Sequence, residues 1–130
     1  MNEFVADTHG LYWYLSNDPK LGSEASKRFQ EAEGGEAVIL IPSIVIAELY
    51  YLLQKQSALE TFEALYDQLA ASAYVRLEPF QAEDVLLFPE LSEIPEMHDR
   101  IIAAVAFAHD APCLTRDGAM VGSGLIQTIW

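Results

Sequence analysis

Basic residues and cysteine are scarce in this sequence. It contains seven Lys and Arg against 20 Asp and Glu, which gives a formal net charge of −13. A protein that binds nucleic acid through its phosphates usually presents a basic face, and this composition supplies little of one. The acidity favours either a metal-binding cluster of carboxylates or attraction to a basic partner. The single cysteine, Cys113, excludes an internal disulfide.

Long hydrophobic runs are also missing. The longest apolar stretch, residues 37–46, is interrupted by Pro42 and Ser43 and is too short to cross a bilayer. The first residues carry no basic stretch ahead of an apolar run, so they do not look like a signal peptide. Hydrophobic residues nevertheless make up 52% of the chain, which excludes a disordered protein. We therefore expect a single cytoplasmic domain of residues 1–130.

The apolar pattern predicts alternating strands and helices. Short apolar or β-branched runs predict strands at residues 3–6, 37–41, 74–78, 113–115 and 126–130. Helical spacing and capping residues predict helices at residues 11–15, 23–34, 44–55, 58–71, 81–88 and 99–109. Strands that alternate with helices form a parallel sheet with helices on both faces. The predicted fold class is therefore α/β.

Glu48 is the lone charge in the apolar segment 44–53. A helix this apolar is expected to be largely buried. A buried carboxylate costs several kcal/mol unless it accepts hydrogen bonds or binds a metal. The alternative is that Glu48 lies on the one stripe of the helix that faces water.

Three more acids stand at positions where strands end or helices begin. Asp7 suits a helix cap, although Thr8 could serve equally well. Asp99 is a first-turn acid that complements a helix dipole, and Asp117 with Gly118 is an ordinary turn signal. Together with Glu48, however, these acids are expected at the strand-end edge where open parallel sheets bind ligands. Two such charges about 5 Å apart repel by roughly 3 kcal/mol, so a cluster needs a cation, and oxygen ligands select Mg²⁺ or Mn²⁺.

At this point the sequence resembles a known family, the PIN domain. The resemblance rests on four segments whose order and spacing match the four successive PIN motifs: residues 5–9, 42–49, 98–104 and 114–117. It covers nearly the whole chain. The resemblance implies a three-layer α/β/α sandwich with a central parallel sheet.

Within that family, a chain of this length is similar to the VapC-type toxins of toxin–antitoxin pairs. The resemblance implies an endoribonuclease that hydrolyses RNA phosphodiester bonds with a metal-activated water. It also implies a cognate antitoxin and a homodimer. The residues implied as catalytic and as ligands of Mg²⁺ or Mn²⁺ are Asp7, Glu48, Asp99 and Asp117.

Neighbouring residues have expected supporting roles. The resemblance implies that Thr8 and Thr115 orient the carboxylates or a metal-bound water. Arg100 is a further supporting candidate, although we expect it to pair with an acid such as Glu96. Arg116 is expected to point away from the acid that follows it, which leaves a phosphate role less favoured. The few basic residues should gather near the acidic pocket.

Histidines and aromatics have simpler interpretations. His9, His98 and His109 lack the spacing of a metal site and are expected to be packing or surface residues. The consecutive aromatics Tyr12, Trp13 and Tyr14 could stack on bases, but an interface with a second copy or an antitoxin is favoured.

Other functions also place acids at strand ends. A phosphatase would need a second Asp where this chain has His9, and the Lys of a receiver domain has no clear counterpart. A stronger alternative is a catalytically silent, acidic PIN-like interaction module that binds a basic protein partner. Measuring the binding of Mg²⁺ or Mn²⁺ distinguishes it from the nuclease.

Overall fold

The computed structural model describes residues 2–130, so Met1, which the predicted domain includes, lies outside the described residues. Five strands form one sheet in the order β3-β2-β1-β4-β5, and every neighbouring pair is parallel. The strands are β1 (Asn2–Ala6), β2 (Ala37–Pro42), β3 (Val75–Glu78), β4 (Cys113–Leu114) and β5 (Thr128–Ile129). The predicted parallel sheet is confirmed, although β4 and β5 are shorter than expected.

The continuous apolar run of β2 follows from its position in the sheet. β2 lies between β1 and β3, with Val5 in register with Leu40 and Ile39 in register with Val75. Ile39, Leu40 and Ile41 are fully buried. A strand that is covered on both faces needs apolar side chains on both, which is why it does not alternate.

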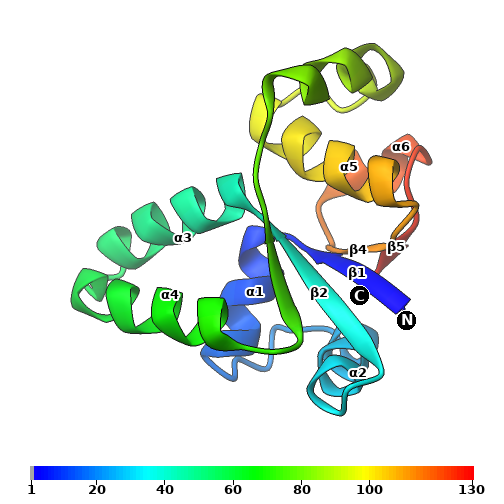
Figure 1. The fold of residues 1–130 in the computed structure, drawn as a ribbon. Coiled ribbons are helices and arrows are strands. Elements are labelled where there is room, and N and C mark those ends of the chain that lie inside the picture. The colour runs from blue at the N-terminus through cyan, green and yellow to red at the C-terminus, as the bar shows by residue number, and fades with distance from the viewer. Residues whose placement is uncertain (1) are drawn as a thin grey trace.

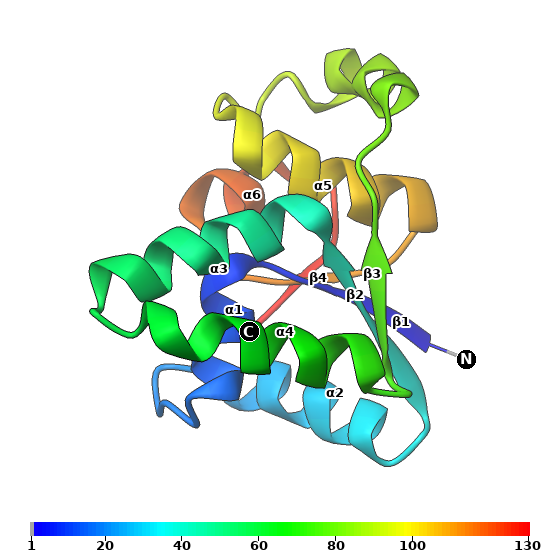
Figure 2. The ribbon, with the colours of Figure 1, turned by 60° about the vertical axis from the view of Figure 1, so that its left-hand side comes forward.

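Helices cover both faces of the sheet (Figures 1 and 2). α1 (Thr8–Leu15), α2 (Ser23–Glu33) and α4 (Phe62–Ala71) lie on one side, and α5 (Met97–His109) and α6 (Gly118–Ser123) lie on the other. α3 (Ser43–Lys55) leaves the end of β2 and runs beside α4 to form a projecting arm. Two 3-10 helices, η1 (Leu59–Thr61) and η2 (Ala82–Leu91), complete the chain. The predicted three-layer α/β/α sandwich is confirmed.

The sheet reverses its direction of growth at β1. The chain adds β2 and β3 on one side of β1, then returns through α5 and adds β4 and β5 on the other side. In open parallel sheets, ligands bind beyond the carboxyl ends of the strands at such a reversal. The ends of β1 and β4 are therefore the place to search for a site.

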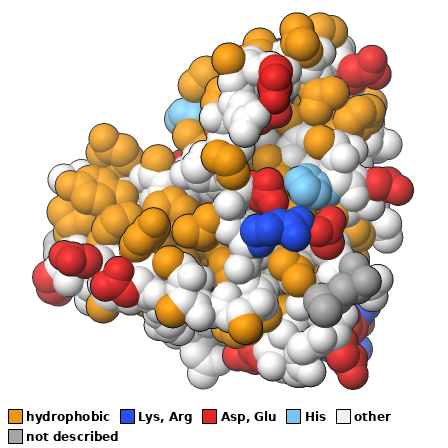
Figure 3. All heavy atoms as spheres, in the orientation of Figure 1, with side chains coloured by type: hydrophobic (Ala, Val, Ile, Leu, Met, Phe, Trp, Pro, Cys, Tyr) orange, Lys and Arg blue, Asp and Glu red, His pale blue; other side chains and the backbone are white. Residues whose placement is uncertain are grey.

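The prediction that the helix around Glu48 is largely buried is wrong. Only one stripe of α3 is buried, formed by Val45, Leu49 and Leu53. Tyr51 is 66% exposed, and Figure 3 shows hydrophobic side chains gathered over the arm of α3 and α4. The apolar composition of α3 thus reflects an exposed apolar surface as well as the core.

Two other helical predictions need correction. The helix expected over residues 58–71 is divided into η1 and α4, and the segment expected as a helix over 81–88 is the 3-10 helix η2. The turn signal of Asp117 and Gly118 in fact marks the start of a helix, because Asp117 caps α6 and Gly118 is its first residue. Within residues 2–130, no helix combines the length and apolarity that a membrane crossing requires.

Candidate active site

The four acidic residues singled out by the sequence line one cavity of about 810 Å³: Asp7, Glu48, Asp99 and Asp117. They come from four elements that the topology brings to the same edge of the sheet. Asp7 follows β1 and Asp117 follows β4 closely, on either side of the reversal. Glu48 lies in α3, which starts where β2 ends, and Asp99 lies in the first turn of α5.

Asp7 is both a helix cap and a wall of the cavity. Its Oδ1 accepts a 2.7 Å hydrogen bond from the backbone N–H of Gly10, so Asp7, and not Thr8, caps α1. Only 7% of Asp7 is exposed, and burial raises its pKa. A Cβ on residue 10 would lie 2.8 Å from Oδ1 of Asp7 and 3.0 Å from the carbonyl oxygen of Leu114. Gly10 therefore allows the cap to form against β4.

Thr8 and Glu48 are joined by a hydrogen bond. The buried hydroxyl of Thr8 donates to Oε1 of Glu48 over 2.6 Å, which links the start of α1 to α3. The other oxygen of Glu48, Oε2, lies 3.5 Å from Nδ1 of His98. The same imidazole nitrogen is 3.4 Å from Glu96. Glu48 is half-buried, and its carboxylate is partnered on both sides.

Thr115 lies between two of the acids. Its hydroxyl oxygen accepts a 3.0 Å hydrogen bond from the N–H of Asp117, and the hydroxyl donates to Asp7, which partly offsets the effect of burial on the pKa of Asp7. Asp117 accepts a 3.1 Å hydrogen bond from the N–H of Met120 and so caps α6. With 1% of its surface exposed, Thr115 is fixed in position between Asp7 and Asp117.

Asp99 experiences the charge of the whole cluster. Its pKa is raised to about 6, first by burial and then by the negative charges of Asp117, Glu96, Glu48 and Asp7, in that order. Its backbone N–H donates to Glu96, the cap of α5. Like charges that raise one another's pKa are destabilising when ionised, and a nearby cation relieves this repulsion.

The donor chemistry of the cavity fits a hard divalent cation, since the four acids offer only oxygen ligands. The side chains are not closed around an ion, however: within residues 2–130, no three His, Cys, Asp or Glu side chains are already arranged to hold a metal. Asp7, Glu48 and Asp117 each accept a hydrogen bond instead. Side-chain adjustment would have to accompany binding.

Both arginine expectations are wrong. Arg100 does not pair with the side chain of Glu96: its guanidinium donates to the carbonyl oxygens of Ile94 and Ser92, and Arg100 is not among the residues that line the cavity. Arg116 does not point away from the site, because it lines the cavity. Its guanidinium carbon lies 4.6 Å from the ring centroid of Trp13.

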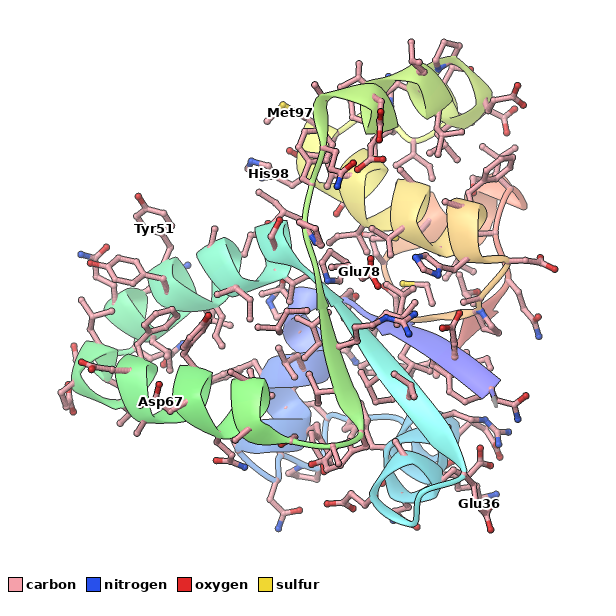
Figure 4. The ribbon with its side chains drawn as sticks, viewed as in Figure 1. Glu36, Tyr51, Asp67, Glu78, Met97 and His98 are labelled. Carbon is pink, nitrogen blue, oxygen red and sulfur yellow. The ribbon has the colours of Figure 1, made fainter. Side chains whose placement is uncertain are left out.

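The histidine and aromatic expectations have mixed outcomes. His9 is exposed and packs against Trp13, as expected of a surface residue, but it also lines the cavity; His109 contacts carboxylates away from the cavity. His98 lines the cavity too, beside Glu48, which the sequence did not indicate; Figure 4 shows it at the start of α5. Trp13 is buried and lines the cavity, and the half-buried Tyr14 stacks on Phe29, so both pack within this chain.

Comparison with known proteins identifies the fold and the family. The PIN domain model matches residues 4–121. Among solved structures, the DNA-bound VapBC2 of Rickettsia felis is 19% identical with a TM-score of 0.74, over 98% of this chain and 97% of that chain. DNA-bound VapBC from Salmonella typhimurium is 18% identical with a TM-score of 0.74, over 99% and 98%. VapC20 of Mycobacterium tuberculosis, a toxin that cleaves the sarcin–ricin loop, is 18% identical with a TM-score of 0.69, over 97% and 98%.

At these identities the structural likeness shows the fold alone. No match to this chain was found among curated proteins. The family model, by contrast, spans the segments that carry all four acids of the cavity. This chain is therefore a member of the PIN domain family.

Proposed function

We propose that this chain is an endoribonuclease that depends on Mg²⁺ or Mn²⁺ and acts as the toxin of a toxin–antitoxin pair. The observation that carries the proposal is the common cavity of Asp7, Glu48, Asp99 and Asp117 at the strand-end edge of the sheet. Acids this distant in sequence share a hollow here, and the pKa values of Asp7 and Asp99 are raised, first by burial and then by neighbouring carboxylates. Perturbed acids in a cleft are typical of functional sites.

The chain's own residues would hold the reacting groups in place. Thr8 fixes one oxygen of Glu48, and Thr115 with the backbone N–H groups of Gly10 and Met120 fixes the two strand-end aspartates. Mg²⁺ or Mn²⁺ bound by the four acids would lower the pKa of an attacking water and neutralise charge on the phosphate. A cation would relieve the repulsion that Asp99 experiences from the neighbouring carboxylates.

The proposed partners are an antitoxin and a second copy of the chain. Two of the similar solved structures are VapBC complexes bound to DNA, and VapC20 is described as a toxin that cleaves the sarcin–ricin loop. Support from this chain comes from its exposed large apolar side chains, among them Tyr51, Leu86 and Met97. Figure 4 shows Tyr51 on α3 and Met97 near the start of α5. Exposed apolar patches of this kind are typical of interaction surfaces.

The proposal is tested by RNA cleavage and growth. The purified protein is incubated with total RNA and Mg²⁺ or Mn²⁺, beside Asp7→Asn and Glu48→Gln variants. Matched controls are Asp67→Asn and Glu36→Gln, which change exposed acids that do not line the cavity (Figure 4). We expect cleavage and growth arrest from the wild type and both controls, and neither from the cavity variants. Arrest that persists in both cavity variants would contradict the proposed site.

A silent interaction module is the second candidate. It is favoured by the lack of a preformed ligand set within residues 2–130 and by the net charge of −13. Calorimetry distinguishes the two functions. Binding of Mn²⁺ that is lost in Asp7→Asn supports the nuclease. No detectable binding, together with intact RNA after long incubation, supports the module.

A further inference from the structure

The positive charges of this chain fall into two groups. Four of the seven Lys and Arg are engaged in local contacts within residues 2–130: Lys27 and Arg28 pair with acids of α2, Arg76 pairs with Glu3 and Glu78, and Arg100 donates to carbonyl oxygens. The side chains of the remaining three form neither an ion pair nor a hydrogen bond with the described residues: Lys20, Lys55 and Arg116. Lys55 and Arg116 line the acidic cavity, and Lys20 lies over Trp13, which lines it too. Two of these three side chains, Lys55 and Arg116, thus lie at the acidic cavity.

Arg116 is held there by aromatic rings. Its guanidinium carbon lies 4.6 Å from the centroid of the Trp13 ring and 5.7 Å from that of Trp130, and the two rings meet edge to face. Trp13 is 8% exposed and so provides a fixed support. Trp130 in turn packs against Gly22, where a Cβ would lie 2.4 Å from the Trp130 carbonyl carbon. Contact with ring faces holds a guanidinium in place and leaves its N–H groups free.

The N–H donors of the Arg116 guanidinium have no partner among the described residues. Its guanidinium donates no hydrogen bond and forms no ion pair with residues 2–130, even though Asp7, Glu48, Asp99 and Asp117 line the same cavity. The side chain is exposed to solvent. A fixed, unpaired guanidinium matches a phosphate group, which it can bind through two parallel N–H donors.

We propose that Arg116, positioned by Trp13 and Trp130, binds a phosphate of the RNA strand next to the one that is cut, and that Lys55 binds another phosphate of the same strand. This inference rests on the proposed ribonuclease function. It explains how a chain of net charge −13 holds a polyanion: Lys55 and Arg116, two of the three basic side chains without an ion pair or hydrogen bond within residues 2–130, line the cavity. Trp13 and Trp130 act as positioning residues, since they contact the guanidinium.

The test measures RNA binding apart from RNA cleavage. A fluorescein-labelled oligoribonucleotide of mixed sequence is titrated at several KCl concentrations, with Asp99→Asn as the reference protein so that the RNA stays intact. Arg116→Gln, Arg116→Lys and Lys55→Gln are made in this background. The control is Lys27→Gln, which removes an exposed cation that pairs with Glu24.

We expect Arg116→Gln and Lys55→Gln each to weaken binding roughly fivefold to tenfold and to reduce the salt slope by about 0.7, the value for one phosphate contact with a single strand. Arg116→Lys should keep the slope and lose part of the affinity, because it keeps the charge and loses the planar fork. Lys27→Gln should match the reference. Arg116→Gln that binds as tightly as Lys27→Gln, or a reference protein that binds no RNA, would overturn the inference. If binding depends on Arg116 but the wild type leaves RNA intact in Mg²⁺ and Mn²⁺, the phosphate contact stands and only the proposed ribonuclease activity is overturned.

Discussion

The hydroxyl of Thr8 donates a 2.6 Å hydrogen bond to Oε1 of Glu48, a residue 40 positions later in the chain. The donor sits in the first turn of α1, directly after the Asp7 cap, so one short segment fixes two of the four cavity acids. Residues that orient a metal-binding side chain commonly contribute about 10- to 100-fold to metal affinity or activity. We expect a contribution of about this size from Thr8.

Thr8→Val removes the donor and keeps the shape of the side chain. We expect cleavage of RNA to fall by roughly tenfold or more, because the Glu48 carboxylate loses a partner that fixes its position. Thr8→Ser keeps the hydroxyl and should stay within a few-fold of the wild type. Initial rates on labelled RNA measure both. Equal rates for Thr8→Val and Thr8→Ser would show that the hydrogen bond does not matter for activity.

Asp99→Asn should stabilise the fold at neutral pH while it abolishes cleavage. The pKa of Asp99 is raised to about 6 in the folded protein, above the ordinary value of 3.8. The stability linked to this shift is therefore fully present below pH 3.8 and is lost as the pH rises through about 6. At pH 7.5 we expect a gain of about 1 to 2 kcal/mol in the free energy of unfolding, after allowing for the partial exposure of the side chain.

Urea unfolding of Asp99→Asn and of the wild type at pH 7.5 and pH 4 measures this difference. The gain should shrink toward pH 4, where Asp99 in the wild type is protonated. Asp67→Asn, which neutralises an exposed acid of α4, is the control and should change stability little at either pH. An Asp99→Asn variant that is less stable than the wild type at pH 7.5 would contradict the charge repulsion in the cavity.

Mn²⁺ should raise the melting temperature of the wild type. An ion that binds only the folded state contributes about 2.7 kcal/mol at 100 times its dissociation constant, which amounts to several degrees for a domain of this size. The rise should be absent or much smaller in Asp7→Asn and Glu48→Gln, and unchanged in Glu36→Gln. Asn is as good a helix cap as Asp, so Asp7→Asn should still fold. Equal shifts in all four proteins would mean that the ion binds elsewhere.

Gly10→Ala should disturb the site through its added methyl group. The new Cβ would lie 2.8 Å from Oδ1 of Asp7 and 3.0 Å from the carbonyl oxygen of Leu114, so the carboxylate or the helix must move. We expect at least about a tenfold loss of cleavage, in spite of the gain of about 1 kcal/mol that Ala usually brings to a helix.

Gly122→Ala is the matched control for Gly10→Ala, because nothing lies within 4 Å of its added Cβ. It should be as active as the wild type and equally or more stable. RNA cleavage and urea unfolding are measured for both variants. If Gly10→Ala cleaves RNA as fast as Gly122→Ala, close packing at residue 10 does not position Asp7.

The sequence predicted the common cavity of the acids for a definite physical reason. In a parallel sheet every strand ends at the same edge, so Asp7 and Asp117, placed after apolar runs, are brought together whatever the details of packing. Their capping roles did not compete with that placement. Each carboxylate accepts a backbone N–H and still lines the cavity.

The position of Arg116 could not be predicted, because it depends on contacts between distant residues. Local alternation suggested that its side chain would leave the site, but Trp13 and Trp130 hold its guanidinium on the cavity wall. Trp130 is placed by its packing on Gly22, more than 100 positions earlier. No pattern within a short window of sequence contains that information.

The exposed side of α3 shows a second limit. Val45 and Tyr51 look alike in a count of apolar residues, yet Val45 is fully buried and Tyr51 is 66% exposed. Periodicity detects burial only where polar residues mark the other side of the helix. Here the other side is apolar too, so the sequence alone could not separate the core of α3 from an exposed surface.

The most direct test of the central claim is anomalous diffraction from crystals soaked in MnCl₂. We predict a manganese peak in the cavity, within about 2.5 Å of carboxylate oxygens of at least two of Asp7, Glu48, Asp99 and Asp117. Crystals of Glu48→Gln should show a weaker peak or none. A wild-type crystal with manganese bound only at other surface acids, and none in the cavity, would contradict the account.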